Sequence, residues 1–257
     1  MKKDNKIIRV KDTVIGGEKP VLIAGPCSIE SREHIIEEAK ALKELGVDII
    51  RGGAFKPRTS PLDFQGIGFR GVEYLKEAAE TVNLPFVTEV LSEDDVDRMI
   101  DYVDIFQVGS RNMYNYALLK KIARTNKPVI LKRGFSATIY EWQMAAKYLE
   151  EGGNDNIIFC ERGIRTFETE TRNTLDLAGA YIIKEKTGYP VIVDPSHGTG
   201  KRELIMPMTR ATLALGLDGV MIEVHPNPDE AISDAAQTIG YDDYKKIADY
   251  VGKFHED

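Results

Sequence analysis

The chain has 257 residues, with 34 basic and 41 acidic side chains and a formal net charge of −7. We do not expect an acidic chain to bind nucleic acids in general, because neutralising phosphates requires a basic surface. Small anionic substrates are not excluded by this argument. A hydrophobic fraction of 42% with 29% charged residues indicates a folded domain with a large core.

No hydrophobic run approaches the roughly 18 residues needed to span a bilayer, and residues 1–14 lack the hydrophobic stretch of a secretory signal. We therefore expect a cytoplasmic protein that does not contact membranes. The two cysteines, Cys27 and Cys160, are too few for a disulfide framework and do not have the CxxC spacing of zinc sites. Cys160 falls near the end of a predicted strand, where we expect it to pack.

The chain begins with a predicted hairpin over residues 1–17, since KIIRV and TVIGG flank Asp12. Eight short runs rich in β-branched residues follow, and each ends in polar or glycine-rich sequence. These predicted strands are 21–27, 48–54, 85–90, 104–109, 128–133, 156–161, 190–194 and 219–224. The hairpin is in a position to plug the N-terminal end of a barrel.

Helical periodicity occupies the segments between the strands. The first helix is predicted over 31–45, where Ile35, Ala39 and Leu42 share one face and Gly46 ends the helix. The third begins with a capping pattern, Ser92 followed by Asp95. The other predicted helices are one that opens near residue 69, and 116–124, 138–150, 174–186, 202–215 and 241–254.

Strand and helix thus alternate eight times, with no linker or change in composition that divides the chain. This alternation predicts a parallel sheet covered by helices, and eight units in about 250 residues favour a closed (β/α)8 TIM barrel. An open doubly wound sheet is the alternative. We expect one catalytic domain over residues 1–257, without an appended regulatory domain and with little direct feedback control.

Active sites of such barrels form at the C-terminal ends of the strands, and ionisable or polar residues follow every predicted strand. Single loop charges are usually only solvated, but six cations would meet at one mouth and indicate a site for anionic groups. These cations are Arg51, Lys56, Arg58, Arg111, Lys132 and Arg162. Gln107 and Ser110 also fall here, and the stretch 56–60, which includes Thr59, suits a terminal phosphate.

A second set of strand-end residues could ligate a metal. Thiolate, imidazole and carboxylate donors together favour a divalent first-row metal over Mg²⁺ or Ca²⁺. The set consists of Cys27, His197, Glu223 and Asp234. By spacing alone the signal is weak, because each residue also has an ordinary structural interpretation. His225 is a rival ligand or a supporting partner, and for His34 we expect no role.

Eight segments of the sequence resemble those of a known enzyme family, and this likeness adds information that residue spacing alone does not give. They read AGPCSIES (24–31), RGGAFKPRTSP (51–61), TEV (88–90), FQVGSRNM (106–113), ILKRG (130–134), ERGIRTFET (161–169), VDPSHGTGKR (193–202) and VMIEVHPNPDEAISDAAQ (220–237). The chain closely resembles the 3-deoxy-D-arabino-heptulosonate 7-phosphate (DAHP) synthases of the shorter microbial branch. This branch is related to the 3-deoxy-D-manno-octulosonate 8-phosphate (KDO8P) synthases.

The resemblance implies condensation of phosphoenolpyruvate with erythrose 4-phosphate, the entry step of the shikimate pathway. It places one divalent metal ion (Mn, Fe, Zn or Co) on the four residues named above. It assigns phosphoenolpyruvate to the cations matching Arg51, Lys56, Arg111, Lys132 and Arg162, and the sugar phosphate to Arg58 and Thr59. Family members are commonly dimers or tetramers, so the resemblance also implies a homo-oligomer.

Three alternatives stay open. A KDO8P synthase would use arabinose 5-phosphate, but its loop typically reads KANRTS or KANRS where this chain has Lys56-Pro57-Arg58-Thr59. Its metal-independent branch carries asparagine where this chain has Cys27, so the thiol implies metal dependence. A Schiff-base aldolase would use Lys132 as nucleophile, and a binding barrel would carry out no chemistry.

Proton transfer in the condensation requires an acid and a base near the aldehyde and the attacking water. Lys56 and Glu89 are the candidates, since Glu89 lies at the end of one predicted strand and Lys56 just after another, on the same rim. The competing interpretation is that both residues only position the substrates.

Overall fold

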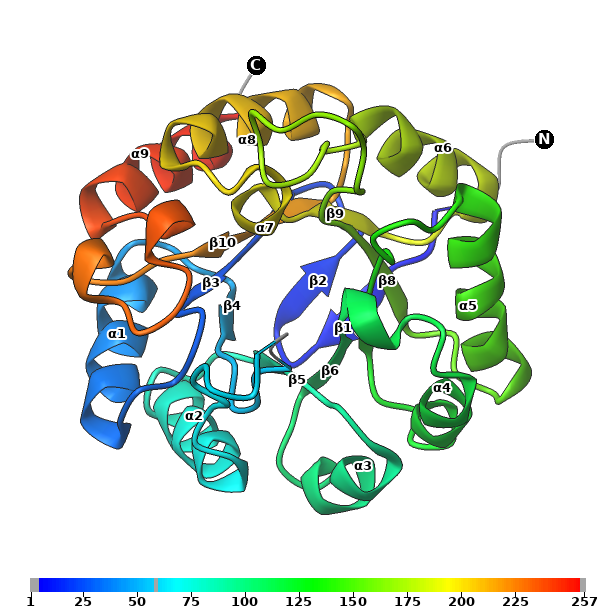
Figure 1. Cartoon of the computed structure of the whole chain (residues 1–257), viewed down its shortest axis with the longest axis horizontal. Helices are drawn as coiled ribbons and strands as arrows, with labels where there is room; N and C mark the ends of the chain where they lie inside the picture. The colour runs from blue at the N-terminus through cyan, green and yellow to red at the C-terminus, as the bar shows by residue number, and fades with distance from the viewer. Residues whose placement is uncertain (1–4, 58–59, 255–257) are drawn as a thin grey trace.

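The computed structural model describes residues 5–57 and 60–254, and its centre is a closed barrel of parallel strands (Figure 1). The strands are β3 (Val21–Gly25), β4 (Ile49–Arg51), β5 (Phe86–Glu89), β6 (Ile105–Val108), β7 (Val129–Lys132), β8 (Ile157–Glu161), β9 (Val191–Val193) and β10 (Gly219–Glu223). They pair in chain order, and β10 pairs with β3 to close the ring. The predicted barrel is confirmed, and the open sheet is wrong.

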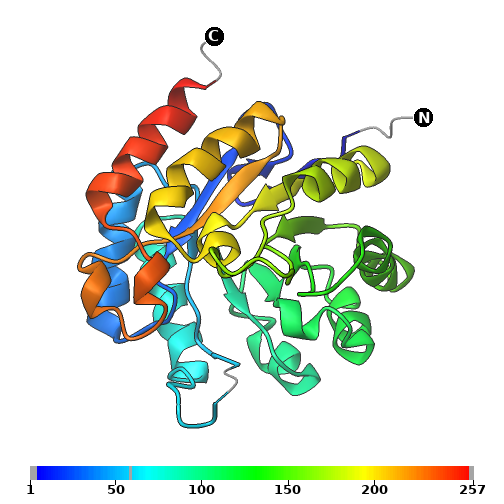
Figure 2. The ribbon, with the colours of Figure 1, turned by 45° about the horizontal axis from the view of Figure 1, so that its top comes forward.

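Helices cover the outside of the barrel (Figure 2). They are α1 (Arg32–Glu44), α2 (Phe69–Thr81), α3 (Glu93–Met99), α4 (Tyr116–Ala123), α5 (Ile139–Glu151), α6 (Leu177–Thr187), α8 (Ile205–Ala214) and α9 (Tyr241–Lys253). Ser92 and Thr138 close capping boxes at the starts of α3 and α5. Helix α6 begins at Leu177, three residues later than predicted. Asp176 is its N-cap, and the Asp176 side chain accepts a hydrogen bond from Gly179 N.

One short helix, α7 (Pro195–Thr199), escaped the sequence prediction. Five residues are too few to show a helical period. Asp194 caps this helix by accepting from the backbone N–H of His197, and Gly200 ends it with φ +71°. The remaining short turns are the 3-10 segments η1 (Ser110–Asn112), η2 (Arg202–Leu204), η3 (Pro228–Glu230) and η4 (Ala235–Gln237).

The N-terminal hairpin is formed by β1 (Ile8–Val10) and β2 (Thr13–Ile15), which pair antiparallel. Its buried side chains Ile8, Val10 and Ile15 join a cluster with the inward-facing residues of the barrel strands. The prediction of a hairpin that plugs the barrel is therefore confirmed for residues 5–17. Cys160 belongs to the same cluster and is fully buried, as predicted.

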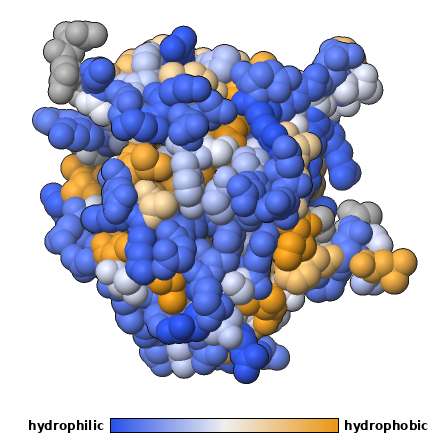
Figure 3. Space-filling model, turned by 90° about the vertical axis from the view of Figure 1, so that its left-hand side faces the viewer, coloured by the Kyte–Doolittle hydropathy of each residue, from blue (hydrophilic) through white to orange (hydrophobic). Residues whose placement is uncertain are grey.

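The side of the molecule that carries α1 and α9 is mainly hydrophilic, with hydrophobic side chains in small patches (Figure 3). In the part of the chain that the structure describes, no helix is both long enough and apolar enough to cross a bilayer.

We expect the hairpin, which plugs the barrel, to make a measurable contribution to stability. Replacing Ile15, which is fully buried, by alanine should lower the free energy of unfolding by about 2–5 kcal/mol, because burial is lost and a cavity opens. Arg9→Ala is the matched control on the exposed face of the same hairpin, with an expected change within about 0.5 kcal/mol. Urea denaturation measures both, and equal effects of the two changes would contradict the plug.

Candidate active site

The C-terminal ends of the barrel strands surround one cavity of about 260 Å³. Its lining contains most of the residues that the sequence predicted for substrate binding. These are Arg51, Lys56, Gln107, Ser110, Arg111, Lys132 and Arg162, together with Glu89. Arg58 and Thr59 lie outside the described residues.

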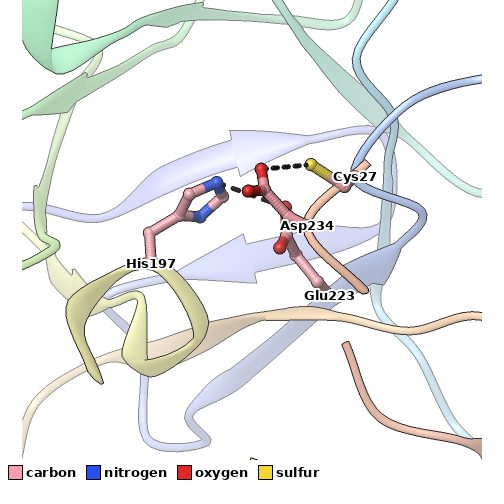
Figure 4. Close-up of side chains that lie close together, drawn as sticks. All are labelled: Cys27, His197, Glu223 and Asp234. Atoms are coloured by element: carbon pink, nitrogen blue, oxygen red, sulfur yellow. Dashed lines mark hydrogen bonds and ion pairs between the residues drawn. The ribbon is translucent and has the colours of Figure 1, made fainter. Parts of the chain in front are cut away.

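Cys27, His197, Glu223 and Asp234 point toward one another at the same rim (Figure 4). One ligand atom from each residue lies within 4.8 Å of the others. Cys27 Sγ donates to Asp234 Oδ2 at 3.0 Å, and His197 Nε2 lies 3.2 Å from Glu223 Oε1. Sulfur, nitrogen and oxygen donors in one group are the set that divalent first-row metals accept.

Asp194 fixes the orientation of the His197 ring. Asp194 Oδ1 accepts from His197 N at 2.9 Å, and Oδ2 lies 2.7 Å from His197 Nδ1. With the ring proton held on Nδ1 by this carboxylate, Nε2 keeps its lone pair on the side of Glu223. A carboxylate behind the distal ring nitrogen is the usual support for a histidine that binds a metal.

The acidic groups of the cluster are suited to binding a cation. Burial, followed by the charge of Glu223, raises the pKa of the Cys27 thiol to about 12. Burial opposes ionisation of Glu223 and Asp234 as well. His197 and Arg51 nevertheless lower the pKa of Glu223, while the Cys27 hydrogen bond and His197 lower that of Asp234. A divalent cation would favour the thiolate and neutralise both carboxylates, so these residues fit a metal ion.

Several cations of the cavity have protein partners. Arg51 Nη1 lies 2.9 Å from Glu223 Oε1, and Lys132 Nζ lies 2.6 Å from Asp194 Oδ2. Lys56 Nζ donates to Cys27 Sγ at 2.8 Å. These contacts hold buried positive charge in place beside the four-residue cluster.

Arg162 differs from these cations. It is 4% exposed, burial lowers its pKa, and no carboxylate of the described residues forms an ion pair with it. Its guanidinium lies 4.7 Å from the centre of the Phe135 ring and lines the cavity, and Nη1 donates to the carbonyl oxygen of Gly163 at 3.4 Å. A buried cation without a directly paired carboxylate favours the entry of an anion.

Glu89 lines the cavity, and its carboxylate is fixed by neighbouring residues. Gln107 Nε2 donates to Glu89 Oε2 at 3.4 Å, and a Cβ on Gly109 would collide with this carboxylate. Burial raises the pKa of Glu89 despite the nearby cations, first among them Lys132. The group is therefore easier to protonate than an exposed glutamate.

Sequence reasoning gave no role to four residues that build the site. Asp194 ends a strand, so its position was visible but its contacts to Lys132 and His197 were not. Arg172 lines the cavity and pairs with Asp234 at 3.2 Å, from a loop without periodicity. The others are Gln237, which donates to Glu223 Oε2, and Phe135.

Two strand-end residues lie elsewhere. Arg133 Nη1 pairs with Glu161 and Asp176 at 3.0 and 2.7 Å and does not line the cavity. His225 is not part of the four-residue cluster and is grouped with Glu30 and His34 instead.

A closed barrel with a cation-lined cavity and a Cys-His-Glu-Asp cluster at its C-terminal rim is typical of TIM-barrel enzymes that act on small anionic molecules. A model described as "DAHP synthetase I family" matches residues 4–257. The chain belongs to this family.

Known relatives agree with this membership. The chain is 48% identical to the phospho-2-dehydro-3-deoxyheptonate aldolase of Thermotoga maritima, over 97% of this chain and 76% of the relative. The crystal structure of the Thermotoga maritima DAHP synthase has a TM-score of 0.95 at 47% identity and covers 98% of this chain and 74% of that one. A 2-dehydro-3-deoxyphosphooctonate aldolase of Methylobacterium radiotolerans is 33% identical, over 92% of this chain and 90% of the relative.

The contacts of Asp194 generate a prediction. Asp194→Asn should weaken binding of Zn²⁺ or Mn²⁺ by about 10–100-fold, because His197 loses the carboxylate that orients it. Isothermal titration of metal-stripped protein measures this affinity.

Asp218→Asn is the matched control. Asp218 is also buried and also paired with a lysine, Lys184 Nζ at 2.8 Å, but it does not contact the cluster. This change should leave the metal affinity unaltered. Equal losses of affinity in both variants would show that Asp194 acts only through general stability.

Proposed function

We propose that this chain catalyses the condensation of phosphoenolpyruvate with erythrose 4-phosphate and water, giving DAHP and phosphate. The observation that carries the proposal is the placement of buried Arg162, which has no ion pair among the described residues, and of the Cys-His-Glu-Asp cluster around one cavity. Membership of the DAHP synthetase I family supports this reaction.

The cations serve to bind two anionic substrates side by side. Phosphoenolpyruvate carries a carboxylate and a phosphate, and Arg162, Arg111 and Lys132 line the cavity where these groups would lie. An arginine offers paired N–H donors that match either anion. Holding both substrates in one cavity replaces a bimolecular encounter by a step within one complex. By resemblance, Arg58 and Thr59 take the phosphate of the sugar.

We propose that Cys27, His197, Glu223 and Asp234 hold one divalent metal ion, of the Mn, Fe, Zn or Co type. When bound, such an ion supplies Lewis acidity toward the aldehyde oxygen of the sugar. Asp194 keeps the His197 ring in the orientation that this role requires.

The reaction forms a bond between C3 of phosphoenolpyruvate and the aldehyde carbon. Water adds at C2, and phosphate leaves as the C–O bond breaks. Lys56 and Glu89 are the proposed proton-handling residues, since both line the cavity. Burial raises the pKa of Glu89, so this carboxyl is easier to protonate than an exposed one, which suits a role in proton transfer.

An assay with two sugars tests the proposal. Erythrose 4-phosphate should be consumed with phosphoenolpyruvate, followed by loss of the enol absorbance, and a chelator should abolish the reaction until Mn²⁺ or a similar ion is restored. Faster consumption of arabinose 5-phosphate would instead favour the activity named for the octulosonate relatives. No reaction with either sugar would contradict both assignments.

Trapping with borohydride distinguishes the Schiff-base mechanism from the metal-dependent one. Lys132 Nζ is engaged by Asp194, and we expect no substrate-dependent covalent capture at this lysine. Capture at Lys132, with activity that survives chelation, would overturn the metal-dependent mechanism.

Arg162→Lys tests the anion site. The change keeps a positive charge but loses the planar donor pair, so KM for phosphoenolpyruvate should rise about tenfold or more. KM for erythrose 4-phosphate should change much less. Arg165→Ala is the control, because Arg165 also lies 4.7 Å from the Phe135 ring but is exposed and does not line the cavity. Steady-state kinetics that show the same change in both variants would argue against direct binding by Arg162.

The proposal includes action in the cytoplasm as a homodimer or homotetramer. These features, like one catalytic domain over residues 1–257, stay predictions. Sedimentation equilibrium measures the state of association.

A further inference from the structure

A second group of potential ligands lies outside the cavity of the proposed reaction. Glu30 follows β3, His34 lies in α1, and His225 follows β10. One ligand atom from each residue lies within 4.8 Å of the others. None of the three lines the cavity at the barrel mouth.

The imidazoles of this group face each other and the carboxylate. The ring centres of His34 and His225 are 4.7 Å apart with the planes tilted by 40°. His225 Nε2 lies 3.5 Å from Glu30 Oε1. This is too far for a strong direct hydrogen bond, but it leaves room for both atoms to bind a shared ion.

The polar atoms here are buried and unsatisfied. Within residues 5–57 and 60–254, His225 Nε2 and both ring nitrogens of His34 have no hydrogen-bond partner. Both carboxyl oxygens of Glu38, which is fully buried one turn along α1, also lack one. Enclosing such groups without partners costs free energy. Several unsatisfied polar atoms in one place therefore favour a bound ligand that would satisfy them.

His225 is oriented as a ligand. Asn227 N donates to His225 Nδ1 at 3.0 Å, and the carbonyl oxygen of Asn227 lies 2.7 Å from the same ring nitrogen. Both contacts are made by Nδ1, so they fix the ring and leave Nε2 facing Glu30 Oε1.

We propose that Glu30, His34 and His225 bind a divalent transition-metal ion of the zinc type, at a site separate from the four-residue cluster. Two imidazoles and one carboxylate form a ligand set that Zn²⁺ accepts, with water as a fourth ligand. Glu38 Oε2 lies 3.9 Å from His34 Nε2, too far for a direct hydrogen bond. The side chains of Glu30 and His34 are 20% and 21% exposed, which gives an ion a path from solvent.

The ion would connect the two segments that carry Cys27 and Asp234. Glu30 Oε1 accepts from the backbone N–H of Ile232 at 3.0 Å, two residues before Asp234. Beside this contact, Ser233 Oγ and Ser28 Oγ are joined by a 2.9 Å hydrogen bond. The proposed ion would therefore brace the loop after β10 against the loop after β3.

Metal stoichiometry tests the proposal. The whole chain, stripped with a chelator and loaded with Co²⁺, should retain two ions per chain after gel filtration. Only the ion bound by Cys27 gives a Co²⁺–thiolate absorption band. Glu30→Gln should retain one ion and keep this band, because the amide oxygen still accepts from Ile232 N while the ligand charge is lost. Cys27→Ser should lose the band and keep the second ion.

Two further variants make the test specific. His34→Gln should also reduce the retained metal from two ions to one, with the thiolate band intact. Glu37→Gln is the matched control on α1, since Glu37 is exposed and paired with Lys40 Nζ at 2.8 Å, and it should keep two ions. Circular dichroism checks the fold of each variant. One ion in the unmodified chain, or two in Glu30→Gln, would overturn the second site.

Discussion

Buried charges of opposite sign hold the mouth of this barrel together. Asp194 Oδ2 faces both Lys132 Nζ and His197 Nδ1, and Glu223 Oε1 faces both His197 Nε2 and Arg51 Nη1. Removing any of these groups from water is costly, so each charge persists only because its neighbour compensates it. The network spans β4, β7, β10 and the start of α7, and it forms only when the strands close in register. The catalytic rim and the closed fold are thus one structure.

The barrel interior changes character along its axis. On β8 the inward positions read Ile158 and Cys160, and Arg162 follows two residues later at the mouth. The two-residue period of a strand therefore takes the same face from hydrophobic packing to charge. The hairpin packs Ile15 against the hydrophobic end of the barrel, and the charges line the cavity at the opposite end. This arrangement keeps the local dielectric low and strengthens every electrostatic contact at the rim.

The sequence predicted what periodicity and strand ends determine. Glu223 and Cys27 come at the ends of hydrophobic runs, so their place on the rim could be read directly. The grouping of Cys27 with Asp234, 207 residues later, was only a weak signal until the resemblance supported it. Periodicity could not predict α7, which aims His197, or the pairing of His225 with His34, because these depend on how a helix packs against a neighbouring loop. The predicted substrate-binding residues that the structure describes line one cavity, because each comes near the end of a barrel strand or in the loop after it.

Asp234 shows how the two proposed ion sites depend on each other. Its φ of +53° lies in the left-handed region, which costs free energy for a residue with a side chain, although aspartate tolerates it better than most. The conformation persists because the surrounding loop is fixed, on one side by Arg172 and on the other by the contact of Glu30 with Ile232. An ion at Glu30 and His34 would reduce the freedom of the same loop before Asp234 engages its own ion. Because such coupling is reciprocal, each ion would strengthen the binding of the other without any shared ligand.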